Sequence, residues 1–155
     1  MLSIEPLLSA ADDDPLVVMR RASEQPATRL IGVVDGDGRL VGVVPIIRLA
    51  QAVVVRVAPE TVMRGLADVD QIAAFGHVVE ARTMRDVMLE PSSVRPDATI
   101  DEAFRTMQTR HQSGLYVIDE DGRPTGYLDL LELVLVYVNT LERAAADDPP
   151  SPAES

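Results

Sequence analysis

The sequence predicts an α+β fold in which one β-α-β-β-α unit, of the α/β type, occurs twice. The main observation is an internal repeat: residues 31–50, IGVVDGDGRLVGVVPIIRLA, align without a gap on residues 115–134, LYVIDEDGRPTGYLDLLELV. Seven of the twenty aligned positions are identical, and most of the others exchange one apolar residue for another. The second observation is that short apolar runs alternate with stretches of helical spacing in both copies. A repeat of this kind indicates two copies of one supersecondary unit.

The second copy has the clearer signals, beginning with a strand over 92–95 that Pro96 ends. Thr99 and Glu102 have the spacing of a capping box, in which each side chain accepts from a free N–H at the start of a helix. Apolar residues then follow at i, i+3, i+4 and i+7, and Gly114 is expected to stop this helix.

A hairpin and a second helix complete the second copy. The predicted strands cover 115–118 and 125–128, and the Asp-Glu-Asp-Gly sequence at 119–122 forms the turn between them. The last helix is expected to begin near Asp129 and to end at about Arg143.

The first copy repeats this order with weaker signals. A poorly marked strand at 7–10 precedes a helix that Asp14 caps and Pro15 begins. Pro26 closes that helix early. Strands at 31–34 and 40–44 then flank a turn, and the next helix starts near Pro45.

Domain boundaries follow from these elements. We expect a first repeat over 1–55, a helical connector over 56–85 and a second repeat over 86–143. The connector helix begins at Pro59–Glu60 and continues through apolar residues to 73. The tail over 144–155 is rich in Pro, Ser and acid, so we expect disorder there.

Composition excludes several classes of function. The net charge of −11 opposes binding to nucleic acid or to an anionic membrane. The chain has no Cys and all 14 of its basic residues are Arg, which excludes thiol chemistry, Schiff bases and a phosphate-loop lysine. No export signal or membrane span is evident, so a cytoplasmic protein is expected. With few aromatic residues, the core must be aliphatic.

The ordered set of motifs resembles a tandem pair of CBS domains, also called a Bateman module. The resemblance rests on DVM at 86–88, on P-D-x-T-x-x-x-A from residue 96, and on an apolar strand followed by Asp, then D-G-R and Gly, in both copies. It implies two repeats packed sheet to sheet about a pseudo-two-fold axis, commonly as a homodimer. It also implies regulation of a separate partner by an adenosyl ligand (AMP, ADP, ATP or S-adenosylmethionine), with no catalytic activity and no required cofactor.

The resemblance also points to candidate ligand-binding residues. The family places a hydroxyl and, three residues later, a ribose-binding Asp after the second hairpin strand; here those positions hold Asp129 and Glu132. In the first copy they hold Pro45 and Arg48, so the ribose acceptor is missing there, and Arg48 either pairs with a phosphate of the other site or is solvated. We expect one altered site, which involves the second copy, and one lost site.

Further candidates come from the residues near the first hairpin strand of each copy. Tyr116 occupies the position that usually lines the adenine slot, and it either stacks on a base or fills the slot itself; Gly32 corresponds to it. Where phosphate-binding pairs often carry His-Arg, the chain has Ser113-Gly114 and Arg29-Leu30, so Arg29 is the better phosphate candidate.

Each candidate has a simpler structural interpretation. Asp129 and Glu132 also form an ordinary capping-box pattern. The Asp-rich turns at 35–38 and 119–122 lack the remaining ligands of a calcium loop, so hairpins are favoured. The acids at 12–14 are interpreted as helix caps, and neither His77 nor His111 has a second ligand at metal-binding spacing.

Two hypotheses follow. In the first, the chain is a homodimeric sensor of an adenosyl metabolite that regulates an unidentified protein partner. In the second, the nucleotide sites have decayed and the chain is a ligand-free dimerisation module.

Overall fold

The order of elements is that of two β-α-β-β-α units. The structure is a computed structural model that describes residues 5–26, 28–57 and 81–147. The connector helix expected near 59–73 lies outside these residues. In chain order the described elements are β1 (Leu8–Ala10), α1 (Pro15–Ala22), β2 (Leu30–Val34), β3 (Leu40–Pro45), α2 (Ile46–Val57), α5 (Met84–Val87), β4 (Ser93–Val94), α6 (Ile100–Arg110), β5 (Gly114–Ile118), β6 (Pro124–Asp129) and α7 (Leu130–Asp147).

The internal repeat persists in the backbone. Strands β2 and β3 match β5 and β6 in length and in start position at the sequence offset of 84. The pair Gly32–Val43 in the first hairpin corresponds to Tyr116–Tyr127 in the second, and both hairpins shift register at equivalent points. The predicted two-copy fold is therefore confirmed.

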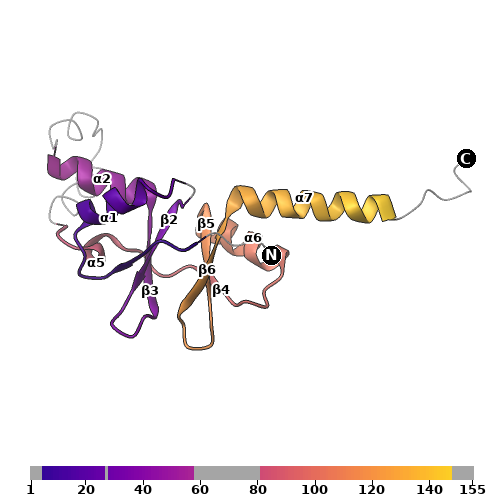
Figure 1. Cartoon of the computed structure of the whole chain (residues 1–155), viewed down its shortest axis with the longest axis horizontal. Helices are drawn as coiled ribbons and strands as arrows, with labels where there is room; N and C mark the ends of the chain where they lie inside the picture. Colours follow the sequence, from indigo (N-terminus) through magenta and orange to yellow (C-terminus); the bar gives the residue numbers. More distant parts are fainter. Residues whose placement is uncertain (1–4, 27, 58–80, 148–155) are drawn as a thin grey trace, which may run out of the picture.

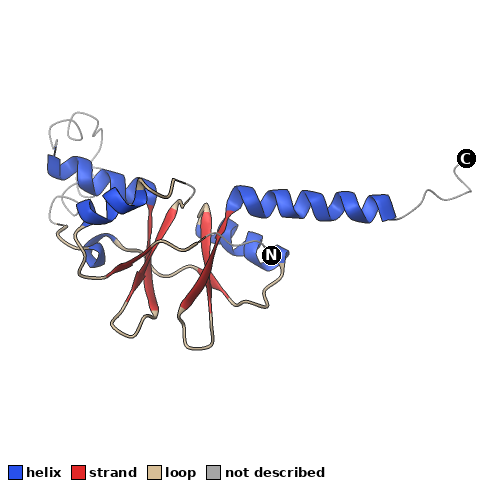
Figure 2. Ribbon diagram, viewed as in Figure 1, coloured by secondary structure: helices blue, strands red, loops and turns tan. Residues whose placement is uncertain are grey.

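Each repeat contributes one three-stranded mixed sheet. The strand orders are β1-β2-β3 and β4-β5-β6, with the first pair parallel and the second antiparallel in each sheet. Figure 1 shows the two sheets facing each other, with α1, α2 and α5 outside the first sheet and α6 and α7 outside the second. The same layers appear by element type in Figure 2, where α7 extends well beyond the sheets.

Aliphatic side chains fill both helix–sheet layers, as the composition requires. The core of the first repeat centres on fully buried residues of α1, β2, β3 and α2, and that of the second on residues of α6, β5, β6 and α7. A third, smaller cluster lies where the sheets face each other and contains Leu30, Val43, Tyr116 and Tyr127. This cluster joins the two repeats.

The helix N-termini follow the capping signals. The carboxylate of Asp14 accepts from the Leu16 amide at 2.8 Å. The capping box of α6 is complete, since Thr99 Oγ1 accepts from the Glu102 amide at 3.1 Å and the Glu102 carboxylate accepts from the Thr99 amide at 3.0 Å. Both caps are confirmed.

Two predicted boundaries are wrong. Helix α6 ends at Arg110, and His111 takes the left-handed conformation (φ 53°) that Gly114 was expected to supply. Gly114 is instead the first residue of β5. Helix α7 continues to Asp147, so its last turn includes residues predicted to lie in a disordered tail. Three consecutive Ala residues explain the extension, because Ala has the highest helix propensity.

The Asp-rich segments form hairpin turns, as favoured from the sequence. The Asp35 carboxylate accepts from the amides of Asp37 and Arg39 at 2.9 and 3.0 Å. The Asp119 carboxylate accepts from the corresponding amides of the second repeat at the same two distances. A glycine closes each turn at a φ near +80°, a conformation that other residues rarely adopt.

Candidate functional site

The candidate site lies where the two repeats meet, and Tyr116 occupies its centre. The Tyr116 side chain is fully buried between the sheets. Its hydroxyl lies 2.7 Å from the carbonyl oxygen of Leu30 and 2.9 Å from that of Leu7, both in the first repeat. A phenol has one proton, so it donates to one of these carbonyls at a time. In this structure the Tyr116 side chain packs in the inter-repeat cluster with Leu30, Val43 and Tyr127.

Two glycines make room for the two central tyrosines. A Cβ added at Gly32 would lie 2.9 Å from Tyr116 Cζ, and a Cβ added at Gly114 would lie 2.0 Å from the Tyr127 hydroxyl. The ring centroids of Tyr116 and Tyr127 are 5.2 Å apart at an angle of 56°. Tyr116 and Tyr127 therefore fit at the interface because Gly32 and Gly114 have no side chains.

A charged pair lies at one end of this interface. Arg29 Nε is 3.5 Å from Asp129 Oδ1, which links the loop before β2 to the end of β6. The Asp129 side chain is only 7% exposed, whereas that of Arg29 is 42% exposed. Among the residues that the structure describes, Asp129 Oδ1 has a nearby cation but no hydrogen bond. Arg29 therefore balances the negative charge of Asp129, but Oδ1 still has a lone pair that accepts no hydrogen bond from those residues. Buried carboxylate oxygens usually accept one.

The same end of the interface holds the start of α7. The Leu130 amide donates to the Ser113 carbonyl at 2.9 Å, and the Leu131 amide donates to Asp129 Oδ2 at 3.1 Å. Asp129 therefore caps the helix. Glu132, in the first turn of α7, is half-buried. Among the described residues it makes no return bond to Asp129, so the expected capping box is half formed.

Tyr127 connects the tyrosine pair to the charged pair. Its hydroxyl accepts from the Arg29 amide at 3.1 Å. Burial raises the pKa of Tyr127 to about 12, and the negative charge of Asp129 acts in the same direction. Burial also raises the pKa of Tyr116, with Tyr127 contributing to the increase. Both phenols are neutral near pH 7, so neither serves as a base there.

The structure thus brings Ser113, Gly114, Asp129 and Arg29 together, with Tyr116 deeper in the interface and Glu132 one helical turn away. Arg48 has a different partner. Its Nε donates to the carbonyl of Val87 in α5, within the first repeat.

Sequence reasoning missed Tyr127 and Thr28. Tyr127 corresponds to Val43 of the first repeat, and this exchange of an aliphatic residue for a phenol was a detectable signal. Thr28, next to Arg29, is buried, and its Oγ1 has no hydrogen-bond partner within the described part of the chain. Nothing in the local sequence distinguishes this Thr from an ordinary loop residue.

Each of the acids at 12–14 faces a different arginine. Asp12, Asp13 and Asp14 pair with Arg85, Arg21 and Arg56 at 3.4, 3.9 and 2.8 Å. Within the described part of the chain, no three His, Asp or Glu side chains gather as metal ligands would. Within the same residues, no helix combines the length and hydrophobicity that a bilayer span needs.

Comparison with known proteins identifies the repeat. Residues 84–139 match the model of the CBS domain. A CBS domain-containing protein from Thermotoga maritima is 24% identical, with a TM-score of 0.65 over 88% of this chain and 87% of that one. CBSX2, a CBS-pair protein from Arabidopsis thaliana, is 17% identical, with a TM-score of 0.61 over 88% and 89% of the two chains. No curated protein sequence gives a significant match.

Several similar structures contain adenosyl ligands. The CBS domain pair of protein MJ0100, in complex with 5′-methylthioadenosine and S-adenosyl-L-methionine, is 16% identical with a TM-score of 0.65 over 90% of this chain and 93% of that one. CBSX2 has also been solved in complex with AMP. Residues 84–139 thus match the CBS domain, and the chain as a whole has the fold of a CBS-domain pair.

Proposed function

We propose that this chain is a non-catalytic regulatory CBS pair that binds an adenosyl-containing metabolite and, as a homodimer, modulates a separate protein partner. The observation that carries the proposal is the cluster of Arg29, Asp129 and Glu132 at the interface of the repeats. It combines a half-exposed cation, a buried carboxylate with one open acceptor site, and a second carboxylate one helical turn away.

Glu132 is the proposed ribose acceptor. A carboxylate can accept from both hydroxyls of a ribose, and Glu132 is half-buried in the first turn of α7 beside the inter-repeat interface. The corresponding position of the first repeat is Arg48, which cannot accept hydrogen bonds. A single ligand, held at the position of Glu132, is therefore expected, and the proposed site is asymmetric.

The adenine must lie at the rim of the inter-repeat cluster that contains Tyr116 and Tyr127. Tyr116 and Tyr127 already occupy the space between the sheets, so a base stacks beside these rings or displaces one of them. Displacing Tyr116 would break its bond to the first repeat. Ligand binding would in this way favour one relative arrangement of the repeats, which is how a population shift reaches a partner.

Charge favours ligands with few phosphates. Two carboxylates and one Arg give the proposed site a net negative charge, and the chain carries −11 overall. S-Adenosylmethionine has a sulfonium cation, whereas ATP has several negative charges, so we expect the former to bind more tightly. The similar structures with methylthioadenosine and S-adenosylmethionine, AMP or ATP support the adenosyl class as a whole.

Thermal unfolding in the presence of candidate ligands tests the proposal. AMP, ADP, ATP, S-adenosylmethionine and NAD are titrated to millimolar concentration against the purified chain. A ligand at 100 times its Kd stabilises the fold by about 2.7 kcal/mol, a shift of several degrees in Tm. Glu132→Ala should reduce that shift, while Glu142→Ala, near the far end of the same helix, should leave it unchanged. No shift with any compound contradicts the sensor.

The second candidate is a ligand-free dimerisation module, and the complete burial of Tyr116 between the repeats favours it. Tyr116 closes the centre of the interface with bonds that need no ligand. Under this alternative, no adenosyl compound changes Tm, and Glu132→Ala does not impair association with the partner. The titration therefore separates the two functions directly.

A further inference from the structure

The ion pair between Arg29 and Asp129 has no charged counterpart at the equivalent positions of the internal repeat. At the offset of 84, Arg29 corresponds to Ser113 and Asp129 corresponds to Pro45. In both repeats the carbonyl of Arg29 or Ser113 accepts from the first amide of the helix that follows the hairpin, α2 or α7, at 2.9 Å. Each repeat holds only one of the two charges, so the ion pair is a contact between repeats that the shared backbone does not require.

Asp129 is the only charged residue that is buried in the described part of the chain. Removing a carboxylate from water is costly unless a cation or hydrogen bonds compensate for it. Its Oδ2 accepts from the Leu131 amide at 3.1 Å, whereas its Oδ1 has, within the same part of the chain, only Arg29 Nε at 3.5 Å. An N–H···O hydrogen bond is normally shorter than about 3.2 Å, so Arg29 compensates the Oδ1 side mainly through its charge.

Arg29 is fixed at its backbone and open at the end of its side chain. Its amide donates to the Tyr127 hydroxyl at 3.1 Å, and its carbonyl accepts from the first amide of α2. The side chain is 42% exposed, and Asp129 is its only ionic or hydrogen-bonding partner among the described residues. A guanidinium carries several N–H donors in a planar fork. These donors therefore stay available to an anion that approaches from solvent.

A ligand phosphate and the Asp129 carboxylate would compete for the same guanidinium. Arginine binds carboxylates and phosphates through the same N–H donors, so the protein already supplies an anion of the kind that a phosphate would provide. A phosphate that replaced Asp129 at Arg29 would also leave a buried carboxylate without its cation. At about 5 Å, repulsion between two unit charges weakens binding roughly 4-fold in water and roughly 300-fold at an effective dielectric constant of about 20.

We propose that Asp129 determines the specificity of the ligand site by occupying Arg29 as an internal anion, so that the site accepts adenosyl compounds without phosphate and rejects AMP, ADP and ATP. This inference rests on the proposed sensor function and deepens it by naming the class of ligand. The open lone pair of Asp129 Oδ1 suits a ligand whose remaining part donates a hydrogen bond or carries a positive charge. Specificity then comes from a repulsive element as well as from attractive contacts.

Pyrophosphate binding to Asp129 variants tests the inference without any adenosyl compound. Asp129→Asn removes the charge and keeps a good N-cap residue for α7, and Asp129→Ser is a second uncharged cap in case the first variant folds poorly. Isothermal titration calorimetry should give each variant a Kd for pyrophosphate at least about tenfold lower than that of the unmodified chain. Far-UV circular dichroism shows that the fold is retained.

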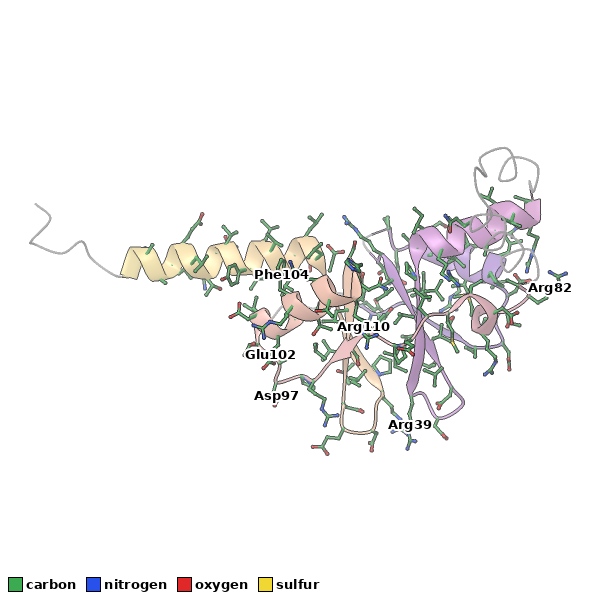
Figure 3. All side chains as sticks on the ribbon, turned by 180° about the vertical axis from the view of Figure 1, so that it is seen from behind. Arg39, Arg82, Asp97, Glu102, Phe104 and Arg110 are labelled. Carbon is green, nitrogen blue, oxygen red and sulfur yellow. The ribbon has the colours of Figure 1, made fainter. Side chains whose placement is uncertain are left out.

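A second substitution shows whether Arg29 is the group that binds the anion. Arg29→Gln in the Asp129→Asn background should abolish the gain in pyrophosphate affinity. Arg39→Gln in the same background is the matched control and should keep the gain, because Arg39 lies at the hairpin turn, at the other end of β2 and β3 (Figure 3). Glu132→Gln removes an equal charge from the first turn of α7 without a direct contact to Arg29, so it should lower the Kd less than Asp129→Asn.

Thermal shifts with 5′-methylthioadenosine and AMP then measure specificity, because the two compounds share adenosine and differ in charge. The unmodified chain should respond more to methylthioadenosine, and this difference should shrink in Asp129→Asn. An unchanged pyrophosphate Kd in both Asp129 variants, a gain that persists after Arg29→Gln, or an unmodified chain that responds more to AMP would each overturn the inference, and the sensor function would stand if either adenosine compound still shifted Tm. A pyrophosphate gain without any adenosine response would instead retract the sensor and leave the competition at Arg29 established.

Discussion

Tyr116 lies against Gly32, the residue that corresponds to it in the other repeat. Its Cζ would be 2.9 Å from a Cβ at Gly32, and its hydroxyl reaches two carbonyl groups of the first repeat. Two identical copies could not make this contact, because two tyrosines would collide there and two glycines would leave a cavity. The repeats have therefore diverged in a complementary way at their shared interface.

Gly32→Ala should destabilise the protein. The new Cβ would approach Leu8 Cδ2 at 2.8 Å and Tyr116 Cζ at 2.9 Å, and the Tyr116 ring is fully buried between the sheets. Overpacking of a buried site typically costs about 1–3 kcal/mol. A urea unfolding curve with a lower midpoint and an unchanged m value is the expected result.

Gly36→Ala is the matched control. A Cβ at Gly36 has no neighbour within 4 Å, so the unfolding midpoint should stay close to that of the unmodified chain. If both variants unfold at the same urea concentration, the close packing of Tyr116 on Gly32 is contradicted.

The fold could be predicted from the sequence because its signals are local and occur twice. Apolar spacing, the Thr99–Glu102 capping box and the Asp-rich turns are each determined within a few residues, and the apolar spacing and the turns occur in both repeats. Even so, Gly114 was wrongly expected to end a helix. Helices often end with a Gly in the left-handed conformation, but here His111 adopts that conformation. Gly114 is needed for a different reason, because a side chain there would collide with Tyr127.

The candidate site was only partly predictable because it depends on contacts between distant residues. Arg29 and Asp129 are separated by 100 positions in the sequence, and no local pattern pairs them. The burial of Tyr116 depends on Gly32 in the same way. The sequence does predict that Asp129 starts a helix, since capping is local.

Tyr116→Phe should weaken the contact between the repeats while preserving the aromatic packing. The substitution removes the hydroxyl that bonds to the carbonyls of Leu7 and Leu30 and leaves buried acceptors with fewer partners. We expect a loss of about 1–3 kcal/mol in the free energy of unfolding. Tyr137→Phe, at a side chain that is 44% exposed, should change it by less than about 0.5 kcal/mol. Equal effects of the two variants would contradict the buried hydrogen bond.

The two buried phenols should make stability fall at alkaline pH. The pKa of Tyr127 rises from 10.0 to about 12 on folding, chiefly through burial, and that of Tyr116 rises for the same reason. A raised pKa means that the folded state holds the proton more tightly. The stabilisation is therefore complete below pH 10 and is lost as the pH approaches and passes 12.

Urea unfolding between pH 9 and pH 12 measures this loss in a Tyr137→Phe background, where only the two buried phenols remain. The midpoint should fall steadily above pH 10, and adding Tyr127→Phe should flatten that decline. A decline that is identical with and without the Tyr127 hydroxyl would assign the alkaline sensitivity to other groups.

The charge of the proposed site predicts an order of ligands. S-Adenosylmethionine should give a larger thermal shift than ATP at equal concentration, because Asp129 and Glu132 outnumber Arg29. Glu132→Gln removes one negative charge but keeps the size of the side chain, so it should narrow the difference between the two ligands. Glu142→Gln removes an equal charge far along α7 and serves as the control. A larger shift with ATP in the unmodified chain would contradict this electrostatic argument.

His111→Gly should stabilise the protein. His111 is exposed and holds φ 53° and ψ 42°, a left-handed conformation that is unfavourable for residues with a Cβ. Glycine adopts this conformation without that penalty and is the usual residue just after a helix, so a gain of about 0.5–1 kcal/mol in the free energy of unfolding is expected. Arg110→Gly, one residue earlier and inside the last turn of α6, should instead lose up to about 1 kcal/mol. Chemical denaturation of the two variants compares them directly, and a destabilised His111→Gly would show that the imidazole makes a contribution beyond the helix end.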